Sequence, residues 1–257
     1  MKKRLDVLLV ERGLAESRAQ AQALVLAGLV HGYDKPGQQL DERVELAVDR
    51  PPPYVSRGGE KLAHGLDALG VDPQGLDCLD VGASTGGFTD VLLQRGAARV
   101  IAVDVGTHQL HEKLRADDRV IVMEQVNARE LTELPFAPQL VVCDVSFISV
   151  TIALPPALDL AAADWQAVVL IKPQFEAGRA EVAKGGGVVR EPETRARVLR
   201  EVAHAVLGWK ASVLGVVDSG LPGPKGNREF FLHLVQSDEP TLPDDFDERI
   251  AAAVAAG

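Results

Sequence analysis

The segment LDVGASTGGFTD (residues 79–90) constrains the fold most strongly, because it joins an apolar run to a helix through a glycine-rich turn. The sequence predicts a strand at residues 76–82 and a helix from about Gly86 to Gln94. Strand-like and helical segments then alternate along the chain, which is typical of a doubly wound, Rossmann-like α/β sheet. The further segments are predicted strands at 99–106, 119–124, 138–146, 167–173, 212–219 and 229–236, and a predicted helix at 192–209.

The glycines of this turn predict a cofactor site, because a backbone without side chains can approach a ligand closely. Their spacing fits neither the dinucleotide fingerprint G-x-G-x-x-G nor a phosphate-binding loop. A wider turn suits a ligand without a pyrophosphate, such as S-adenosylmethionine, although an ordinary strand-to-helix turn is the alternative. We expect Asp80 to hold the methionine amino group through the turn, Asp104 the ribose and Asn127 the adenine. The remaining predicted cofactor contacts are Gly82, Ser84, Thr85, Gly86, Gly87, Phe88, Val105 and Asp144.

Lys172 directly follows the apolar run VVLI (residues 168–171), so we expect its ammonium group to be partly desolvated and its pKa lowered. Taken alone, a lysine that reaches solvent at a strand end is the simpler interpretation. However, Asp144 ends the preceding predicted strand, Lys61 precedes the first strand and Glu229 begins the last. The sequence therefore predicts two lysines and two carboxylates at strand ends, close to one methyl donor.

The N-terminal residues are expected to form a separate small α+β module. One helix closes on Gly13, and a second begins with a capping box of Ser17 and Gln20 and closes on Gly28. A strand is expected at 43–48, and three consecutive prolines make the segment after it a stiff linker. The predicted organisation is a module at 1–49, a linker at 50–60, a catalytic domain at 61–237 and an acidic tail with a short helix at 238–257.

The charge distribution permits a nucleic-acid partner although the net charge is −10. Residues 1–61 carry 10 basic and 9 acidic side chains (+1), and residues 172–229 carry 10 and 7 (+3). The acidic side chains concentrate at 62–171 (6 basic, 15 acidic, −9) and from 230 onwards (1 and 6, −5). No apolar stretch approaches the roughly 20 residues that span a bilayer. The two cysteines lie in apolar runs, as expected for buried thiols of a cytoplasmic protein.

Six stretches of the chain resemble motifs of one family, the TlyA ribosomal-RNA 2′-O-methyltransferases, which are often labelled hemolysins. They are SRGGEKL, DVGASTGGFT, VVCDVSFIS, LIKPQFEAGR, KGGGVVR and GPKGNREF. The resemblance implies an FtsJ-like methyltransferase domain and a small N-terminal RNA-binding domain like that of a small-subunit ribosomal protein. It also implies a catalytic Lys-Asp-Lys-Glu tetrad, which falls on Lys61, Asp144, Lys172 and Glu229. Cytidines of the small subunit, the large subunit or both are the implied substrates.

The chemistry of ribose methylation gives each member of the tetrad an expected role. A 2′-hydroxyl is a poor nucleophile and needs a base as it attacks a sulfonium methyl group. We expect Lys172 to be that base, Asp144 to orient it, and Lys61 and Glu229 to fix the ribose. The glycine-rich segment 177–190 is expected to form a mobile loop over the substrate. The predicted RNA contacts are Lys3, Arg4, Arg12, Arg18, Arg43 and Arg57, with Arg4 and Arg18 the strongest candidates.

Two other functions remain open at this stage. A membrane-active hemolysin would need an amphipathic helix, and the only candidate lies in the acidic tail, whose charge is wrong for anionic lipid. An RNA-binding assembly factor without catalysis is the second alternative, and the intact tetrad disfavours it. The segment HQLHE (108–112) invites a zinc site, but it matches no metalloprotease pattern and we expect an exposed helical face without metal. The oligomeric state is not predicted.

Overall fold

The computed structural model describes residues 2–49 and 52–256. The chain divides into two compact units, Met1–Pro53 and Tyr54–Gly257. In the described part, no helix is both long enough and apolar enough to cross a membrane.

The N-terminal unit is a small α+β module. Strand β1 (Lys2–Arg4) pairs antiparallel with β2 (Gln39–Asp41), and helices α1 (Leu5–Glu11) and α2 (Arg18–Leu26) lie between them in sequence. The hydroxyl of Ser17 caps α2 by accepting the N–H of Gln20, as predicted. The side chain of Gln20 accepts the N–H of Glu16 and not that of Ser17, so the capping box is incomplete.

The prediction of a strand at 43–48 is wrong. Residues 43–47 lack regular structure, and Val48 makes a single isolated bridge with Val30. The segment has the alternating pattern of a strand, but no neighbouring strand lies along it. A strand needs a paired neighbour to satisfy the hydrogen bonds of its backbone.

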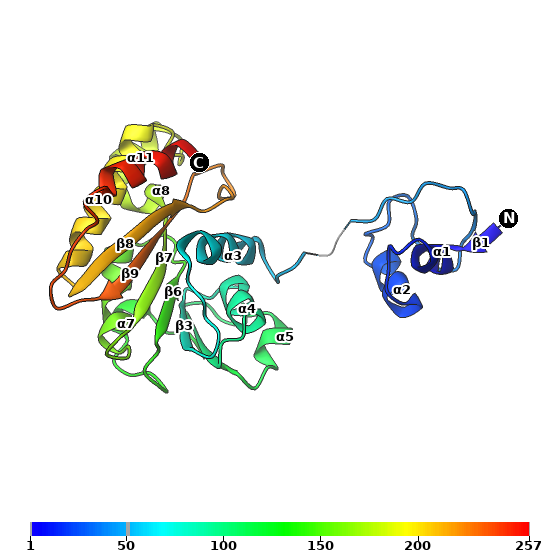
Figure 1. The fold of residues 1–257 in the computed structure, drawn as a ribbon, viewed down its shortest axis with the longest axis horizontal. Coiled ribbons are helices and arrows are strands. Elements are labelled where there is room, and N and C mark those ends of the chain that lie inside the picture. Colours follow the sequence, from blue (N-terminus) through cyan, green and yellow to red (C-terminus); the bar gives the residue numbers. More distant parts are fainter. Residues whose placement is uncertain (1, 50–51, 257) are drawn as a thin grey trace. The chain divides into compact units, whose positions relative to one another are not determined.

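The second unit is built on a seven-stranded sheet in the order β5-β4-β3-β6-β7-β9-β8, which confirms the predicted α/β class (Figure 1). The first five of these strands are parallel, whereas β9 is antiparallel to both β7 and β8. The strand order reverses between β3 and β6, and ligands bind at such switch points. The strands are β3 (Asp77–Val81), β4 (Arg99–Asp104), β5 (Val120–Glu124), β6 (Leu140–Cys143), β7 (Gln166–Ile171), β8 (Ala211–Asp218) and β9 (Phe230–Gln236).

Helices cover both faces of this sheet, because alternate residues of each strand point to opposite sides (Figure 1). One face packs against α3 (Arg57–Leu69), α4 (Gly87–Gln94) and α5 (Glu112–Arg115), with Leu62, Leu66 and Phe88 in the core. The other face packs against α6 (Val150–Ala153), α7 (Pro155–Asp159), α10 (Pro192–Leu207) and α11 (Phe246–Ala256). The central strands are therefore buried on both sides, and only their ends are available for a site.

Two segments differ from their predicted roles. Residues Arg57–Glu60, which were assigned to the linker, form the first turn of α3. Helix α11 is not a free tail, because Phe246, Ile250, Ala253 and Val254 are buried in the core with β8 and α10.

The two cysteines, Cys78 and Cys143, lie inside β3 and β6 and are fully buried. Burial raises the pKa of each thiol to about 12, so both remain protonated at neutral pH.

Candidate active site

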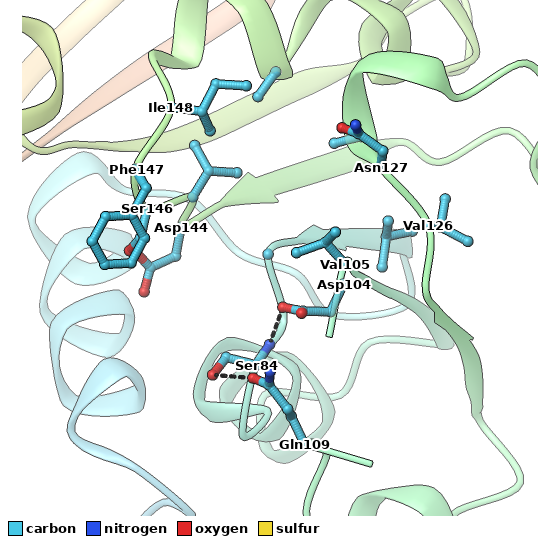
Figure 2. A pocket seen from close by; sticks show the side chains of 15 residues that line it. Ser84, Asp104, Val105, Gln109, Val126, Asn127, Asp144, Ser146, Phe147 and Ile148 are labelled. Atoms are coloured by element: carbon cyan, nitrogen blue, oxygen red, sulfur yellow. Dashed lines mark hydrogen bonds between the residues drawn. The ribbon is translucent and has the colours of Figure 1, made fainter. Parts of the chain in front are cut away.

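A cavity of about 340 Å³ opens at the carboxyl ends of β3, β4 and β6, at the point where the strand order reverses (Figure 2). Six of the residues that the sequence predicted as cofactor contacts line it: Gly82, Ser84, Asp104, Val105, Asn127 and Asp144. Its size lies within the range of about 300–1,000 Å³ that is usual for small-molecule sites.

The glycine turn after β3 is held close to the loop after β6. Gly82 has a φ of +85°, and a Cβ atom at this position would lie 2.7 Å from the carbonyl oxygen of Asp144. A side chain is therefore excluded by both the backbone conformation and the contact. Gly86, the N-cap of α4, also has a positive φ, of +94°.

Asp104, at the end of β4, organises the turn from the other side. One carboxylate oxygen accepts the N–H of Ser84 at 2.8 Å (Figure 2), and the other accepts the N–H of Gly106 at 2.7 Å. The neighbouring side chain of Val105 is 74% exposed beside the cavity. Asn127 caps a short 3-10 helix, η1 (Ala128–Glu130), by accepting the N–H of Arg129.

The donors and acceptors of this cavity fit an adenosine. A carboxylate at the end of the second parallel strand suits two ribose hydroxyls, and an exposed apolar side chain next to it suits the flat face of a base. An amide at Asn127 can pair with the edge of the base. The residues present therefore suit S-adenosylmethionine, the cofactor that the sequence predicted.

Asp80 is positioned differently from the prediction. Its side chain is fully buried and does not line the cavity. One oxygen accepts both the N–H and the hydroxyl of Thr89 in the first turn of α4, at 2.9 and 2.7 Å, while the other has no partner. Burial raises the pKa of Asp80 to about 7, and the nearby Asp144 carboxylate adds to this effect. Asp80 thus supports α4 and the turn.

A second cavity, of about 400 Å³, lies beside the first and contains all four residues of the predicted tetrad. Lys61, Asp144, Lys172 and Glu229 line it together with Thr85, Gly87 and Phe88 of the glycine turn. Gly82, Ser84, Asp144 and Ser146 line both cavities, so the two are adjacent.

The tetrad consists of two ion pairs. Nζ of Lys61, from α3, lies 2.5 Å from a Glu229 oxygen, and Nζ of Lys172 lies 2.5 Å from an Asp144 oxygen. The first pair is almost inaccessible, with 9% and 2% of the side chains exposed, and the second is more open, with 11% and 25% exposed. Lys172 and Asp144 are therefore the pair that a substrate can reach more easily.

The loop before β9 closes tightly over Glu229. A Cβ atom on Gly223 would lie within van der Waals overlap of a Glu229 oxygen, so only glycine fits there. The second oxygen of the Glu229 carboxylate, the one not paired with Lys61, lies 3.4 Å from the amide nitrogen of Gln174. Arg57 donates to the backbone oxygen of Pro222 in the same loop.

Lys172 lies at the start of a single helical turn, α8 (Pro173–Glu176), and makes two further contacts there. Its Nζ donates to the hydroxyl of Ser146 at 2.8 Å, and it lies 5.9 Å from the ring centre of Phe175. Phe147 is 92% exposed with a φ of +65°, and its ring lies 5.1 Å from that of Phe175. An exposed aromatic surface thus lies next to the tetrad.

Segment 177–190, predicted as a mobile loop, contains the short helix α9 (Arg179–Lys184). The buried side chain of Asn227 ties its end to the loop before β9. Asn227 accepts the N–H of Val189 and donates to the backbone oxygen of Gly187, both at 2.9 Å. A third cavity, of about 340 Å³, lies between this segment and Lys172.

Four of the predicted RNA contacts are already engaged within the N-terminal unit. Arg4 and Arg18 both pair with Asp6, a fully buried carboxylate, while 44% and 59% of their own side chains stay exposed. These contacts hold the pKa of Asp6 well below its usual range. Lys3 pairs with Glu11, and Arg12 donates to the backbone oxygens of Glu42 and Val44. Arg43 and Arg57 are exposed.

The sequence did not reveal Ser146, Gln174 or Asn227 as parts of the site. All three lie within the motifs that carry the resemblance, but nothing in their spacing separates them from neighbouring polar residues. The segment HQLHE is not the helical face that was expected, since α5 begins only at Glu112. Within the described residues, no cluster of three or more histidine, cysteine or acidic side chains could hold a metal ion.

Known proteins share both units of this chain. Residues 54–236 match the FtsJ-like methyltransferase family, and residues 3–31 match the S4 domain. The chain is 45% identical to the 16S/23S rRNA (cytidine-2′-O)-methyltransferase TlyA of Mycobacterium tuberculosis, over 99% of this chain and 98% of that protein. It is 38% identical to Hemolysin A of Brachyspira hyodysenteriae, over 90% and 99%. A solved structure of a candidate hemolysin from Streptococcus thermophilus has a TM-score of 0.75 and 44% identity, covering 98% of this chain and 95% of that one.

Proposed function

The chain belongs to the FtsJ-like methyltransferase family, as its sequence motifs predicted, and from this premise we propose that it methylates ribose 2′-hydroxyls of ribosomal RNA. Its cofactor is S-adenosylmethionine. The observation that best supports the proposal is the shared wall of the two cavities. Asp144 and Ser146 line both the cofactor cavity and the cavity of the tetrad, so a methyl donor and a ribose can meet there.

Lys172 acts as the general base in this proposal. A ribose hydroxyl in the tetrad cavity gives its proton to Nζ of a neutral Lys172, and the O–H bonding electrons become available for the new oxygen–carbon bond. When bound, S-adenosylmethionine supplies an electrophilic methyl group, and the carbon–sulfur electron pair stays on sulfur after transfer. Lys172 is then an ammonium group paired with Asp144, and it gives its extra proton to solvent between turnovers.

Asp144 and the Lys61–Glu229 pair have supporting roles. Asp144 holds Lys172 at 2.5 Å and presents negative charge to the cofactor cavity, where the cofactor carries its positive charge. Lys61 and Glu229 neutralise each other in an almost inaccessible part of the same cavity. They form a fixed polar wall against which the ribose is oriented.

The aromatic surface beside Lys172 suits an unstacked nucleobase. Sequence-specific RNA recognition targets bases that can be splayed out and stacked on aromatic side chains. Phe147 is 92% exposed and forms a pair with Phe175 at the edge of the third cavity. We propose cytidine as the base, after the relative from Mycobacterium tuberculosis.

The N-terminal S4 domain supplies affinity for RNA in this proposal, and Arg4 and Arg18 are its main expected RNA contacts. Their guanidinium groups are held by one buried carboxylate and are still about half exposed, so they are oriented before a phosphate binds. We propose that the protein acts in the cytoplasm, because ribosomal RNA is its proposed substrate.

A methylation assay on ribosomal particles tests the proposal. Small subunits, large subunits and naked ribosomal RNA, from cells that lack the protein, would be incubated with it and methyl-labelled cofactor. We expect label in 2′-O-methylcytidine at a defined position of at least one substrate. Bound cofactor without any label on the three substrates would favour the RNA-binding assembly factor instead.

The hemolysin name of one relative raises a membrane-active alternative, which the position of α11 disfavours. The apolar residues of this helix, the expected membrane contact, are buried in the core and cannot enter a lipid surface without unfolding part of the domain. Dye release from anionic vesicles would test this alternative, and we expect none.

A further inference from the structure

Ser146 has a position that the mechanism above does not use. It lies two residues after Asp144, is exposed, and lines the cofactor cavity, the tetrad cavity and the third cavity. Its hydroxyl oxygen accepts a hydrogen bond from Nζ of Lys172 at 2.8 Å. The side chain is therefore at the place where cofactor, ribose and base would meet, and it touches the group that takes the proton.

We propose that Ser146 is a positioning residue that, together with Asp144, aims the lone pair of Lys172 at the ribose hydroxyl. The inference rests on the proposed function, since it needs Lys172 as the base. An ammonium group has three N–H donors, and a neutral amine has two N–H donors and one lone pair. With a single acceptor, the amine could still rotate about its Cε–Nζ bond.

Two acceptors from fixed positions remove this freedom. Nζ of Lys172 lies 2.5 Å from an Asp144 oxygen, as an ion-pair contact, and donates one N–H to Ser146, so these two contacts together limit the direction that is left for the lone pair. After proton transfer the same two contacts persist, and the N–H that received the proton points back to the oxygen that has been methylated. In the described part of the chain, the structure gives the Lys172 amine one side-chain hydrogen bond, to Ser146, and one ion-pair contact, with Asp144.

The backbone around Ser146 is rigid enough for this role. On one side, Asp144 continues the sheet by donating its N–H to the backbone oxygen of Val81. On the other, Phe147 adopts a φ of +65°, a left-handed conformation that is unfavourable for a residue with a side chain. Strain of this kind persists where the surroundings hold it, and here the ring of Phe147 packs against Phe175 in α8. Phe175 is only three residues from Lys172, so α8 ties Ser146 and Lys172 together.

The other charged groups around Lys172 cannot replace this contact. Lys61 and Lys225 carry the same charge as the protonated amine, and Glu229 is already paired with Lys61. Removing the hydroxyl would leave Asp144 as the single acceptor. The amine of Lys172 would still be present, but its lone pair would point away from the ribose hydroxyl for a fraction of the time. A misplacement of about 1 Å can lower the rate on the order of 100-fold.

The test compares Ser146→Ala, Ser146→Thr and, as a control, Ser237→Ala in the full-length protein. Ser237 is a serine at the far end of β9 whose hydroxyl donates to the backbone oxygen of Glu239. Initial rates would be measured with the ribosomal substrate that wild type methylates, together with cofactor affinity by calorimetry. We expect Ser146→Ala to lower kcat about 10- to 100-fold, with the KM for RNA and the cofactor Kd within about twofold of wild type. Ser146→Thr, which keeps the acceptor, should recover most of kcat, and Ser237→Ala should match wild type.

Three results would overturn the inference. Full kcat in Ser146→Ala would show that the hydroxyl is dispensable. An increase of KM without a fall in kcat would assign Ser146 to substrate binding, and a threonine variant as slow as the alanine variant would exclude the hydroxyl as the cause. Failure of the proposed function itself looks different, because wild type would then be inactive or Lys172→Ala would be fully active.

Discussion

Nζ of Lys61 lies 2.5 Å from a carboxylate oxygen of Glu229, and 168 residues of sequence separate the two partners. Their ion pair joins α3, the first helix of the catalytic unit, to the residue that directly precedes β9. Since both side chains are almost inaccessible, removing one of them leaves the other charge poorly hydrated and without its partner. The pair is therefore part of the fold as well as part of the cavity wall.

Glu229→Ala should destabilise the protein strongly, because it leaves the Lys61 charge buried without a partner. The expected loss in the free energy of unfolding is about 3–5 kcal/mol. The double variant Lys61→Met/Glu229→Leu should recover much of this loss while remaining inactive, because both charges are gone. Urea unfolding followed by circular dichroism would measure all three proteins. A double variant no more stable than Glu229→Ala would contradict the buried-charge explanation.

Gly82→Ala should impair cofactor binding more than it impairs folding. A Cβ atom at this position would press on the backbone oxygen of Asp144, in the wall of the cofactor cavity. We expect at least a tenfold increase in the Kd for S-adenosylmethionine, which corresponds to about 1.4 kcal/mol. The matched control is Gly75→Ala, where φ is also positive at +74° but no atom lies within 4 Å of the added Cβ. This control should lose about 1 kcal/mol of stability and keep its affinity. Equal affinity losses in both would attribute the effect to backbone strain alone.

The contribution of Asp80 to the stability of the cofactor-free protein should fall as the pH rises between about 4 and 7. Its pKa in the folded protein is about 7, against an ordinary value of 3.8, so the folded state binds the additional proton in this interval. Asp80→Asn cannot ionise and should show a smaller decrease over the same interval, by up to a few kcal/mol. Thermal or urea unfolding at several pH values would give both curves. Parallel curves would mean that Asp80 is ionised in the folded protein throughout.

Arg18→Gln should weaken RNA binding in a salt-dependent way. Each phosphate contact contributes about one unit to the slope of log K against log salt, so this slope should become shallower by about one. Arg200→Gln is the control, since Arg200 is also an exposed arginine, pairs with an acidic side chain, Asp247, and lies in the other unit. Filter binding at several salt concentrations would test the prediction. The same change in slope for both variants would indicate a general effect of net charge.

Much of the fold follows from the sequence, because buried parallel strands are nearly continuous apolar runs and their ends carry the polar residues. The strands at the centre of the sheet and the meeting of Asp144, Lys172 and Glu229 could be predicted in this way. Ser146 could not, since its role depends on the turn of the chain at Phe147. That positive φ belongs to an aromatic residue, which gives no signal in the sequence.

Helix α3 was not predicted, because the glycines that its packing requires are unfavourable for a helix. Its sequence contains Gly58, Gly59 and Gly65, which are poor helix formers and resemble a linker after the prolines. The structure explains two of them, because a Cβ on Gly59 would overlap Tyr54 and a Cβ on Gly65 would lie 2.6 Å from the ring of Phe231. The close approach of α3 to the sheet places Lys61 in the cavity. Tertiary contact thus overrides local propensity at this position, and the sequence alone does not show it.

Lys172 is the proposed base for ribose methylation, and the most direct test of this role compares wild type with Lys172→Ala. Both would be incubated with the ribosomal substrate under single-turnover conditions, after calorimetry has established that each binds S-adenosylmethionine. We predict that wild type forms 2′-O-methylcytidine and that the variant, with cofactor affinity unchanged, is slower by at least about 100-fold. A variant that methylates the same ribose at the wild-type rate would contradict the assignment of Lys172 as the base.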